Sequence, residues 1–178
     1  MTFTHIPAVL KEAAQWVGWR IKERDGEAMK VPFDPVTGEY ASVAEPGTLS
    51  GFEAAVAFYR AVDDVDGLGF VFTADDPFAG VDLDDCRDPA IGAFADWTVE
   101  IIRRLESYTE RCPSGTGIHI IVEGAVPTGG NRRGDVEMYD RNRYFTVTGT
   151  GARRTSDSAT LPRRIRGHPE RPDRPTTR

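Results

Sequence analysis

The sequence contains few of the residues that cross-link a small protein. Only two of its 178 residues are cysteines, Cys86 and Cys112, and they do not have C-x-x-C spacing. Two cysteines are too few for a disulfide framework, and their spacing gives no support to a structural zinc site. We therefore interpret both as small buried hydrophobic residues.

Long apolar runs are also missing. No segment approaches the roughly 20 apolar residues that span a bilayer, and residues 1–7 lack the basic region and apolar core of a secretory signal. Hydrophobic residues make up 39% of the chain and aromatic residues 10%, which is ordinary for a globular protein. We expect one soluble, cytoplasmic domain with a real core and no membrane partner.

Positive charge is scarce in most of the chain. The formal net charge is −6, but the segment 152–178 holds eight arginines against three acidic residues, so residues 1–151 are strongly acidic. This balance argues against binding nucleic acid by bulk attraction alone. Because the arginine- and proline-rich end has almost no apolar residues, we predict a domain over 1–151 and a disordered tail over 152–178.

Two helices are predicted from the spacing of apolar residues. Ser50 and Glu53 have the pattern of a capping box, and apolar residues then recur at helical spacing over 50–61. A second amphipathic stripe predicts a helix over 93–107 that packs on a sheet.

The remaining pattern is that of short strands and turns. Strands are predicted at 16–21, 30–33, 68–72, 79–83, 117–122, 136–139 and 143–147. The short connection after residue 139 predicts that the last two strands pair as an antiparallel hairpin. The segment 124–134 is rich in glycine and polar residues and predicts a mobile basic loop without regular structure. Seven short strands with two or three helices imply an α/β (α+β) fold.

The most informative segment is an apolar run that ends in carboxylates, Gly80-Val81-Asp82-Leu83-Asp84-Asp85. Successive side chains of a strand point to opposite faces, so Asp82 and Asp84 share one face. Two carboxylates on one face suit Mg²⁺ or Mn²⁺, which prefer oxygen ligands. The alternative is that these acids only end a strand and begin a solvated loop.

Two further motifs follow this D-x-D pattern. The segment from Ser114 to His119 contains two glycines that would let the backbone approach a phosphate, but it lacks the Gly-Lys-Ser/Thr ending of a Walker-type ATPase. Val136-Glu137-Met138-Tyr139 then places one acid on a later strand. Taken alone, a histidine beside apolar residues, as His119 is, is more typical of a structural residue than of a ligand.

These three motifs in this order resemble the archaeo-eukaryotic primase superfamily, and most closely the primase-polymerase domains of phages and plasmids. The resemblance covers about residues 16–149. It implies an RRM-like α/β catalytic core with an accessory α/β layer and a mostly antiparallel or mixed sheet. It also implies a metal-dependent nucleotidyltransferase, a DNA primase or polymerase that joins NTPs or dNTPs on a DNA template.

The resemblance also implies roles for individual residues. Asp82, Asp84 and Glu137 would be the catalytic residues and would hold Mg²⁺ or Mn²⁺ beside the incoming triphosphate and the attacking hydroxyl. His119 would contact the triphosphate, with Ser114 a weaker contributor.

Three further basic or small residues complete the expected nucleotide site. They are Gly117, Arg143 and Lys30. Arg143 opens the last predicted strand and could reach a phosphate, although a salt bridge with Asp140 or Glu137 would also explain it. Lys30, one of only three lysines, precedes a proline as a basic residue does in members of this group.

Arg132 and Arg133 could bind the backbone of a template or primer without sequence preference, or could simply be solvated. The expected partners are a DNA template or primer and an NTP or dNTP, with a separate replicative helicase as a further candidate because no helicase portion is visible. The main alternative function is a non-catalytic module that binds nucleotide or nucleic acid, and a metal-dependent nuclease is a third.

Overall fold

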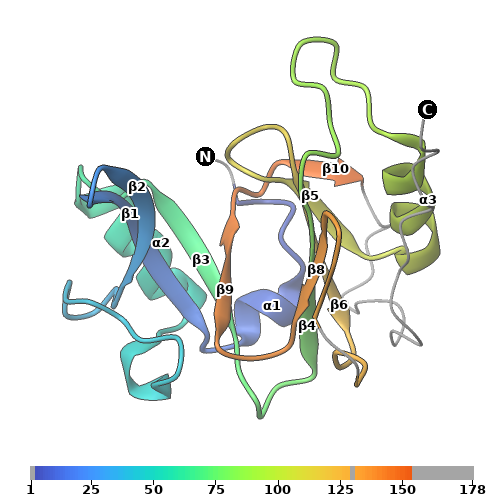
Figure 1. The fold of residues 1–178 in the computed structure, drawn as a ribbon. Coiled ribbons are helices and arrows are strands. Elements are labelled where there is room, and N and C mark those ends of the chain that lie inside the picture. Colours follow the sequence, from blue (N-terminus) through green and yellow to red (C-terminus); the bar gives the residue numbers. More distant parts are fainter. Residues whose placement is uncertain (1–2, 129–130, 154–178) are drawn as a thin grey trace.

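The computed structural model describes residues 3–128 and 131–153 of the chain. Two antiparallel sheets and three α-helices make up this part (Figure 1). The helices are α1 (Ala8–Glu12), α2 (Phe52–Ala61) and α3 (Asp96–Leu105), and Pro46–Thr48 forms a 3-10 turn. The structure confirms the expected α/β (α+β) class and the mostly antiparallel pairing.

Each sheet combines pairs of consecutive strands with strands that are distant in the sequence. The first has the order β2 (Glu27–Phe33), β1 (Trp16–Arg24), β3 (Gly67–Phe72) and β9 (Arg143–Val147). The second has the order β10 (Gly151–Arg153), β5 (Tyr108–Arg111), β6 (Ile118–Glu123), β4 (Phe78–Leu83), β8 (Val136–Tyr139) and β7 (Arg132–Arg133). An inner strand of the first sheet, β3, is followed in the chain by β4, an inner strand of the second.

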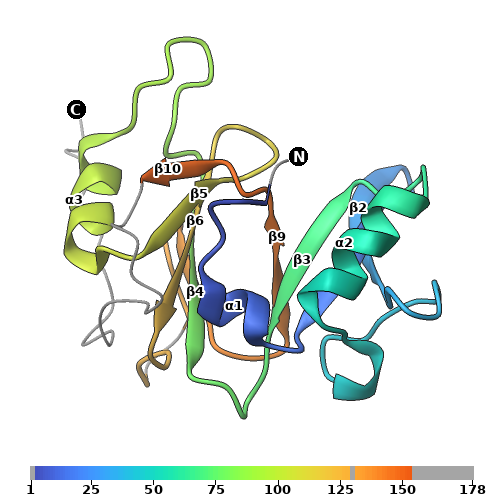
Figure 2. The same cartoon turned by 180° about the vertical axis from the view of Figure 1, so that it is seen from behind.

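One hydrophobic core joins the two sheets through α1 and α2. Seen from behind, α2 covers the first sheet and α1 lies between the sheets (Figure 2). Trp16 anchors this core: its indole N–H donates to the carbonyl of Leu10 at 2.8 Å, and its ring meets Phe52 and Phe70 edge-on. Such aromatic packing accounts for much of the apolar area that a domain of this size buries.

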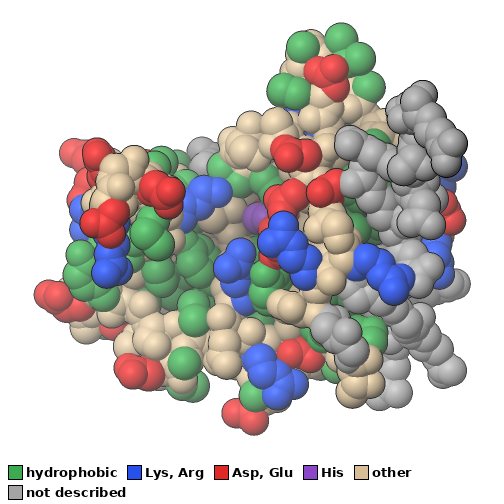
Figure 3. Space-filling view, viewed as in Figure 1, with side chains coloured by type: hydrophobic (Ala, Val, Ile, Leu, Met, Phe, Trp, Pro, Cys, Tyr) green, Lys and Arg blue, Asp and Glu red, His purple; other side chains and the backbone are tan. Residues whose placement is uncertain are grey.

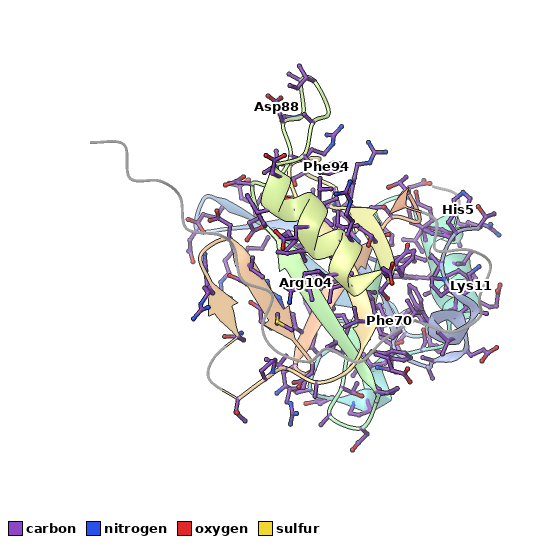
Figure 4. All side chains as sticks on the ribbon, turned by 90° about the vertical axis from the view of Figure 1, so that its right-hand side faces the viewer. His5, Lys11, Phe70, Asp88, Phe94 and Arg104 are labelled. Carbon is purple, nitrogen blue, oxygen red and sulfur yellow. The ribbon has the colours of Figure 1, made fainter. Side chains whose placement is uncertain are left out.

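A second core lies beneath α3, which covers the other face of the second sheet (Figure 4). Val81 and Leu83 of β4 are fully buried there against Trp97 and Ile101 of α3. Because strand side chains alternate between faces, the residue between them, Asp82, faces the opposite way. The predicted alternation of this strand is therefore confirmed.

Both predicted helices exist, but their ends differ from the prediction. The N-cap of α2 is Gly51, without a side-chain cap, so the capping-box prediction for Ser50 is wrong. Ser50 instead exchanges two backbone hydrogen bonds with Trp16, at 2.9 and 3.0 Å. Tertiary pairing to β1 thus outweighs the local capping preference. The second helix ends early because Glu106 adopts a left-handed conformation with φ of 44°.

The prediction that the last two strands form a hairpin is wrong. β8 pairs with β4 in the second sheet, whereas β9 pairs with β3 in the first. The connection therefore crosses from one sheet to the other. Each strand gains an apolar neighbour that is already part of a core, and burial against β3 and β4 outweighs pairing with the nearest strand in the sequence.

Three strands and one helix were not predicted: β5, β7, β10 and α1. Arg132 and Arg133, expected in an irregular loop, form β7 beside β8. Residues 129–130 of that segment and 154–178 of the expected tail lie outside the described residues. Among the described residues, no helix is long and apolar enough to cross a membrane.

Candidate active site

Five polar side chains form a row across one face of the second sheet. Asp82 on β4 lies directly opposite His119 on β6 and, on its other side, Glu137 on β8. The row continues to Glu110 on β5, which pairs with His119, and to Arg132 on β7, which pairs with Glu137. Residues directly opposite each other in antiparallel strands share a face. We call these five residues the polar row.

The middle of the polar row borders a cavity of about 590 Å³ between the two sheets. Asp82 and His119 line one side, and Lys30 and Arg143 come from strands of the first sheet. Figure 3 shows a histidine at the bottom of a hollow with basic and acidic side chains around it. The cavity thus combines carboxylate with basic groups, as a site for a polyphosphate and a cation requires.

The surroundings of Asp82 and Asp84 destabilise the ionised form of each carboxyl group. Burial, followed by the neighbouring charges of Asp84 and Glu137, raises the pKa of Asp82 to about 7. Burial, followed by the charge of Glu137, also raises the pKa of Asp84. The Oδ1 atom of Asp82 is buried and has no hydrogen-bond partner within the described residues. Such a set of oxygen donors fits a bound Mg²⁺ or Mn²⁺.

Glu137 already has two partners. Its Oε1 atom lies 2.8 Å from Nη1 of Arg132, and its Oε2 atom accepts a hydrogen bond from the hydroxyl of Tyr139. The side chain of Glu137 is 10% exposed and that of Arg132 is 66% exposed. A cation at Glu137 would therefore compete with an arginine that can move into solvent.

His119 is held as a neutral imidazole. Its Nδ1 atom lies 3.1 Å from the carbonyl oxygen of Thr146, and its ring stacks on Phe145 with centroids 4.3 Å apart. Because a carbonyl only accepts hydrogen bonds, Nδ1 carries the proton and Nε2 presents a lone pair. Burial lowers the pKa of His119 to about 4. Donation from Nε2 to a phosphate would require the imidazolium, which a polyphosphate's charge favours.

The two basic residues of the cavity rest on aromatic rings. Nζ of Lys30 lies 5.7 Å from the ring of Trp19, and the guanidinium of Arg143 lies 4.7 Å from that of Tyr139. The alternative ion pair of Arg143 with Asp140 or Glu137 is not formed within the described residues; Asp140 pairs with Arg141 at 2.9 Å. Both cations therefore remain available to a ligand.

Ser114 and Gly117 are not among the residues that line the cavity. The hydroxyl of Ser114 is 3.1 Å from that of Thr116 in an exposed turn. A Cβ on Gly117 would lie 3.0 Å from both Sγ of Cys112 and the carbonyl oxygen of Leu83. The close packing of this turn against β4 explains why glycine stands there.

Two residues of the site were missed in the sequence. Glu110 is 1% exposed and accepts hydrogen bonds from the Tyr108 hydroxyl and the backbone N–H groups of Thr148 and Gly149. Cys112 was interpreted as buried and hydrophobic, but it is only half-buried, whereas Cys86 is buried as expected. The signal for Cys112 was its place two residues before the Ser114 to His119 motif.

The comparisons with known proteins agree with the resemblance drawn from the motifs. No family model matches the sequence. A DNA primase-polymerase of Nitratiruptor phage NrS-1 is 37% identical over an alignment of 155 residues, which covers 81% of this chain and 20% of that protein. The chain spans about one fifth of the relative's length. It is therefore similar in sequence to one part of a phage DNA primase-polymerase.

Proposed function

We propose that this chain is a metal-dependent nucleotidyltransferase of the primase-polymerase kind that joins NTPs or dNTPs on a DNA template. The observation that carries the proposal is the position of Asp82 between Glu137 and His119, beside a cavity with two basic residues. The similarity to a protein named as a DNA primase-polymerase supports the same activity.

Asp82, Asp84 and Glu137 would hold the Mg²⁺ or Mn²⁺ ions. The partnerless Oδ1 of Asp82 and the raised pKa of Asp82 support this assignment, since burial and the charges of Asp84 and Glu137 raise that pKa and a bound cation would offset them. Bound divalent ions would lower the pKa of the attacking hydroxyl and neutralise charge on the leaving pyrophosphate.

The chain's own cations would bind and orient the triphosphate. Lys30 and Arg143 extend from the first sheet into the cavity, where they face the acids on the second sheet. A protonated His119 would donate from Nε2 to a phosphate oxygen while Nδ1 keeps its bond to Thr146. The stack on Phe145 holds the imidazole ring in this orientation.

Nucleic acid would lie beside β7 at the edge of the second sheet. Arg132 and Arg133 are both exposed there, and Arg132 lies opposite Glu137 in the polar row. Contacts from arginine to phosphate would position a primer or template without reading its sequence. A separate helicase is a further candidate partner of this chain.

A non-catalytic module that binds nucleotide or nucleic acid is the second candidate. The ion pair between Arg132 and Glu137 favours this second candidate, because Arg132 already neutralises a carboxylate that catalysis would need for binding a metal ion. A module of this kind would bind a nucleotide in the cavity without joining it to a chain.

The test is incubation of the purified protein with labelled NTPs or dNTPs, Mn²⁺ or Mg²⁺, and single-stranded or primed DNA. The matched control is the double variant Asp82→Asn, Asp84→Asn. Metal-dependent product that the control lacks would establish synthesis, and product without a supplied primer would establish priming. Nucleotide binding without product would support the binding module, and metal-dependent loss of the DNA would indicate a nuclease.

A further inference from the structure

Asp82, Cys112 and His119 bring three different ligand atoms together. An oxygen, the sulfur and a ring nitrogen all lie within 4.8 Å of one another. Cys112 directly follows β5, and its backbone N–H donates to the carbonyl of Gly117 at 3.0 Å, which closes the turn before β6. The absence of a side chain on Gly117 leaves room for the sulfur, because a Cβ there would lie 3.0 Å from it.

The lone pairs of this cluster face each other. Nε2 of His119 carries no proton, since Nδ1 donates to Thr146, and it lies 3.7 Å from Oδ1 of Asp82. That distance is too long for a hydrogen bond, and Oδ1 has no hydrogen-bond partner within the described residues. Two facing acceptors, with the ring nitrogen oriented by a carbonyl behind it, are the usual surroundings of a metal ion.

The sulfur decides which metal fits. Mg²⁺ and Ca²⁺ take oxygen ligands, whereas Zn²⁺ and Co²⁺ also accept thiolate and imidazole. Bonds of about 2.0–2.3 Å in a tetrahedral site put ligand atoms roughly 3.3–3.6 Å apart. The cluster is slightly wider than this, so a small inward movement of the side chains would close it. Three protein ligands leave a fourth position open to the cavity, which Asp82 and His119 line.

We propose that Asp82, Cys112 and His119 bind one Zn²⁺ ion at a site that shares only Asp82 with the set of three carboxylates. Binding replaces the S–H bond of Cys112 by a Zn–S bond and releases one proton to solvent. Because Asp82 belongs to both sets, Zn²⁺ and the Mg²⁺ or Mn²⁺ of the carboxylate set exclude each other. Inhibition of synthesis by Zn²⁺ follows from this exclusion and rests on the proposed function; the Zn²⁺ site itself does not.

The site is tested with Co²⁺ as a spectroscopic substitute for Zn²⁺, without nucleotide or DNA. Titration of the reduced full-length protein should give one equivalent of bound Co²⁺ with a thiolate-to-metal charge-transfer band in the near ultraviolet. One equivalent of Zn²⁺ should abolish the band, and excess Mg²⁺ should weaken Co²⁺ binding. A protein that binds Co²⁺ without this band would overturn the proposal.

The variants assign the band to its ligands. In Cys112→Ser the band should be absent and Zn²⁺ should bind at least about tenfold more weakly. Cys86→Ser is the matched control, because Cys86 is the other free cysteine and lies outside the cluster; it should keep the band. Cys112→Ala is a second removal of the thiol if the serine variant melts early. A band that survives in both Cys112 variants, or disappears in Cys86→Ser, contradicts the assignment.

The consequence for synthesis is measured separately. If the proposed function holds, one equivalent of Zn²⁺ should slow Mg²⁺-supported incorporation by the wild type, and Cys112→Ser should need at least about tenfold more Zn²⁺ for the same fractional loss. Equal sensitivity of the two proteins would contradict mutual exclusion. A protein that never incorporates nucleotide but shows the cobalt band would disprove the proposed function alone.

Discussion

Asp82 on β4 and Glu137 on β8 lie directly opposite each other in an antiparallel strand pair, so two carboxylates are neighbours on one face of the second sheet. Like charges in such a pair destabilise a sheet. Burial, with the charges of Asp84 and Glu137, raises the pKa of Asp82 to about 7. An arrangement that costs stability without a cation is expected at a functional site.

Asp82→Asn should therefore stabilise the metal-free protein while it removes activity. At pH 8 with a chelator we expect a gain of about 2 kcal/mol, or roughly 4–8 °C in melting temperature. The asparagine amide can also donate to Nε2 of His119. Thermal unfolding measures the change, and Asp85→Asn is the control because Asp85 is exposed beside the same strand. A lower melting temperature for Asp82→Asn would be incompatible with this account.

Stability should fall as the pH rises from about 5 to 8. Burial raises the pKa of Glu110 from 4.5 to about 7. The folded protein then holds a proton that the unfolded chain releases, so the free energy of unfolding decreases until Glu110 is ionised in both states. Asp82 contributes with the same sign, and together the two carboxyl groups outweigh His119, whose pKa of about 4 acts in the opposite direction below pH 6.5.

Urea unfolding at several pH values, with a chelator, measures this slope. Glu110→Gln should flatten it, even though the variant loses an acceptor for Thr148 and Gly149. Glu123→Gln is the control, because Glu123 is exposed at the end of β6. An unchanged slope in Glu110→Gln would show that this carboxyl keeps its ordinary titration.

Gly80→Ala should disturb His119 from a distance. A Cβ at Gly80 would overlap the ring of Phe145 and lie 2.7 Å from that of Phe72. We expect a loss of about 1–3 kcal/mol from overpacking, measured by urea unfolding, and weaker nucleotide binding, because Phe145 stacks on His119. Gly47→Ala is the control, since a Cβ there meets nothing within 4 Å. Equal stability of the two variants would refute this packing argument.

Arg132→Ala should tighten metal binding. Removal of the cation that lies 2.8 Å from Glu137 leaves the acids more negative. Because solvent screens the pair on the side of the exposed arginine, we expect an effect of about 1 kcal/mol at most, so that Mn²⁺ binds roughly two- to fivefold more tightly. A Mn²⁺ titration followed by electron paramagnetic resonance measures this, with Arg141→Ala as the control because Arg141 pairs with Asp140 instead. If Arg132→Ala leaves the Mn²⁺ affinity unchanged but weakens DNA binding, Arg132 does not compete with the metal ion. Its role is then only the contact with DNA that the sequence predicts.

Much of the site was predictable because its residues lie on strands with strict alternation. Val81 and Leu83 are buried beneath α3, so Asp82 had to face the other way. The glycines and apolar residues around His119 likewise marked a turn that enters a buried strand. For these elements, the alternation of buried and polar residues and the glycines of the turn were enough to predict the strand and the face that it buries.

Strand pairing was not predictable in the same way. The strands β8 and β9 are both short and apolar, and a hairpin between them satisfies every local rule. The choice of β4 and β3 as partners depends on contacts between distant residues, such as Phe70 with Phe145 in the register of the first sheet. A single sequence does not display such contacts.

Glu110 shows why β5 was missed. A strand that reads Tyr-Thr-Glu-Arg has too little apolar character to be recognised, yet Glu110 is buried. Its burial is possible because the Tyr108 hydroxyl and two backbone N–H groups donate to it. Those donors are brought together only by the fold.

The central claim is that residues on neighbouring strands form one active site, and Glu137→Gln in a primer-extension assay tests it most directly. The assay compares this variant with Asp82→Asn, the double variant and the Asp85→Asn control, using Mg²⁺ or Mn²⁺ and a labelled primer on DNA. Residues that act as a unit are not additive, so we predict that each single variant is as inactive as the double one, while the control extends the primer. Extension by Glu137→Gln at the wild-type rate would contradict the account.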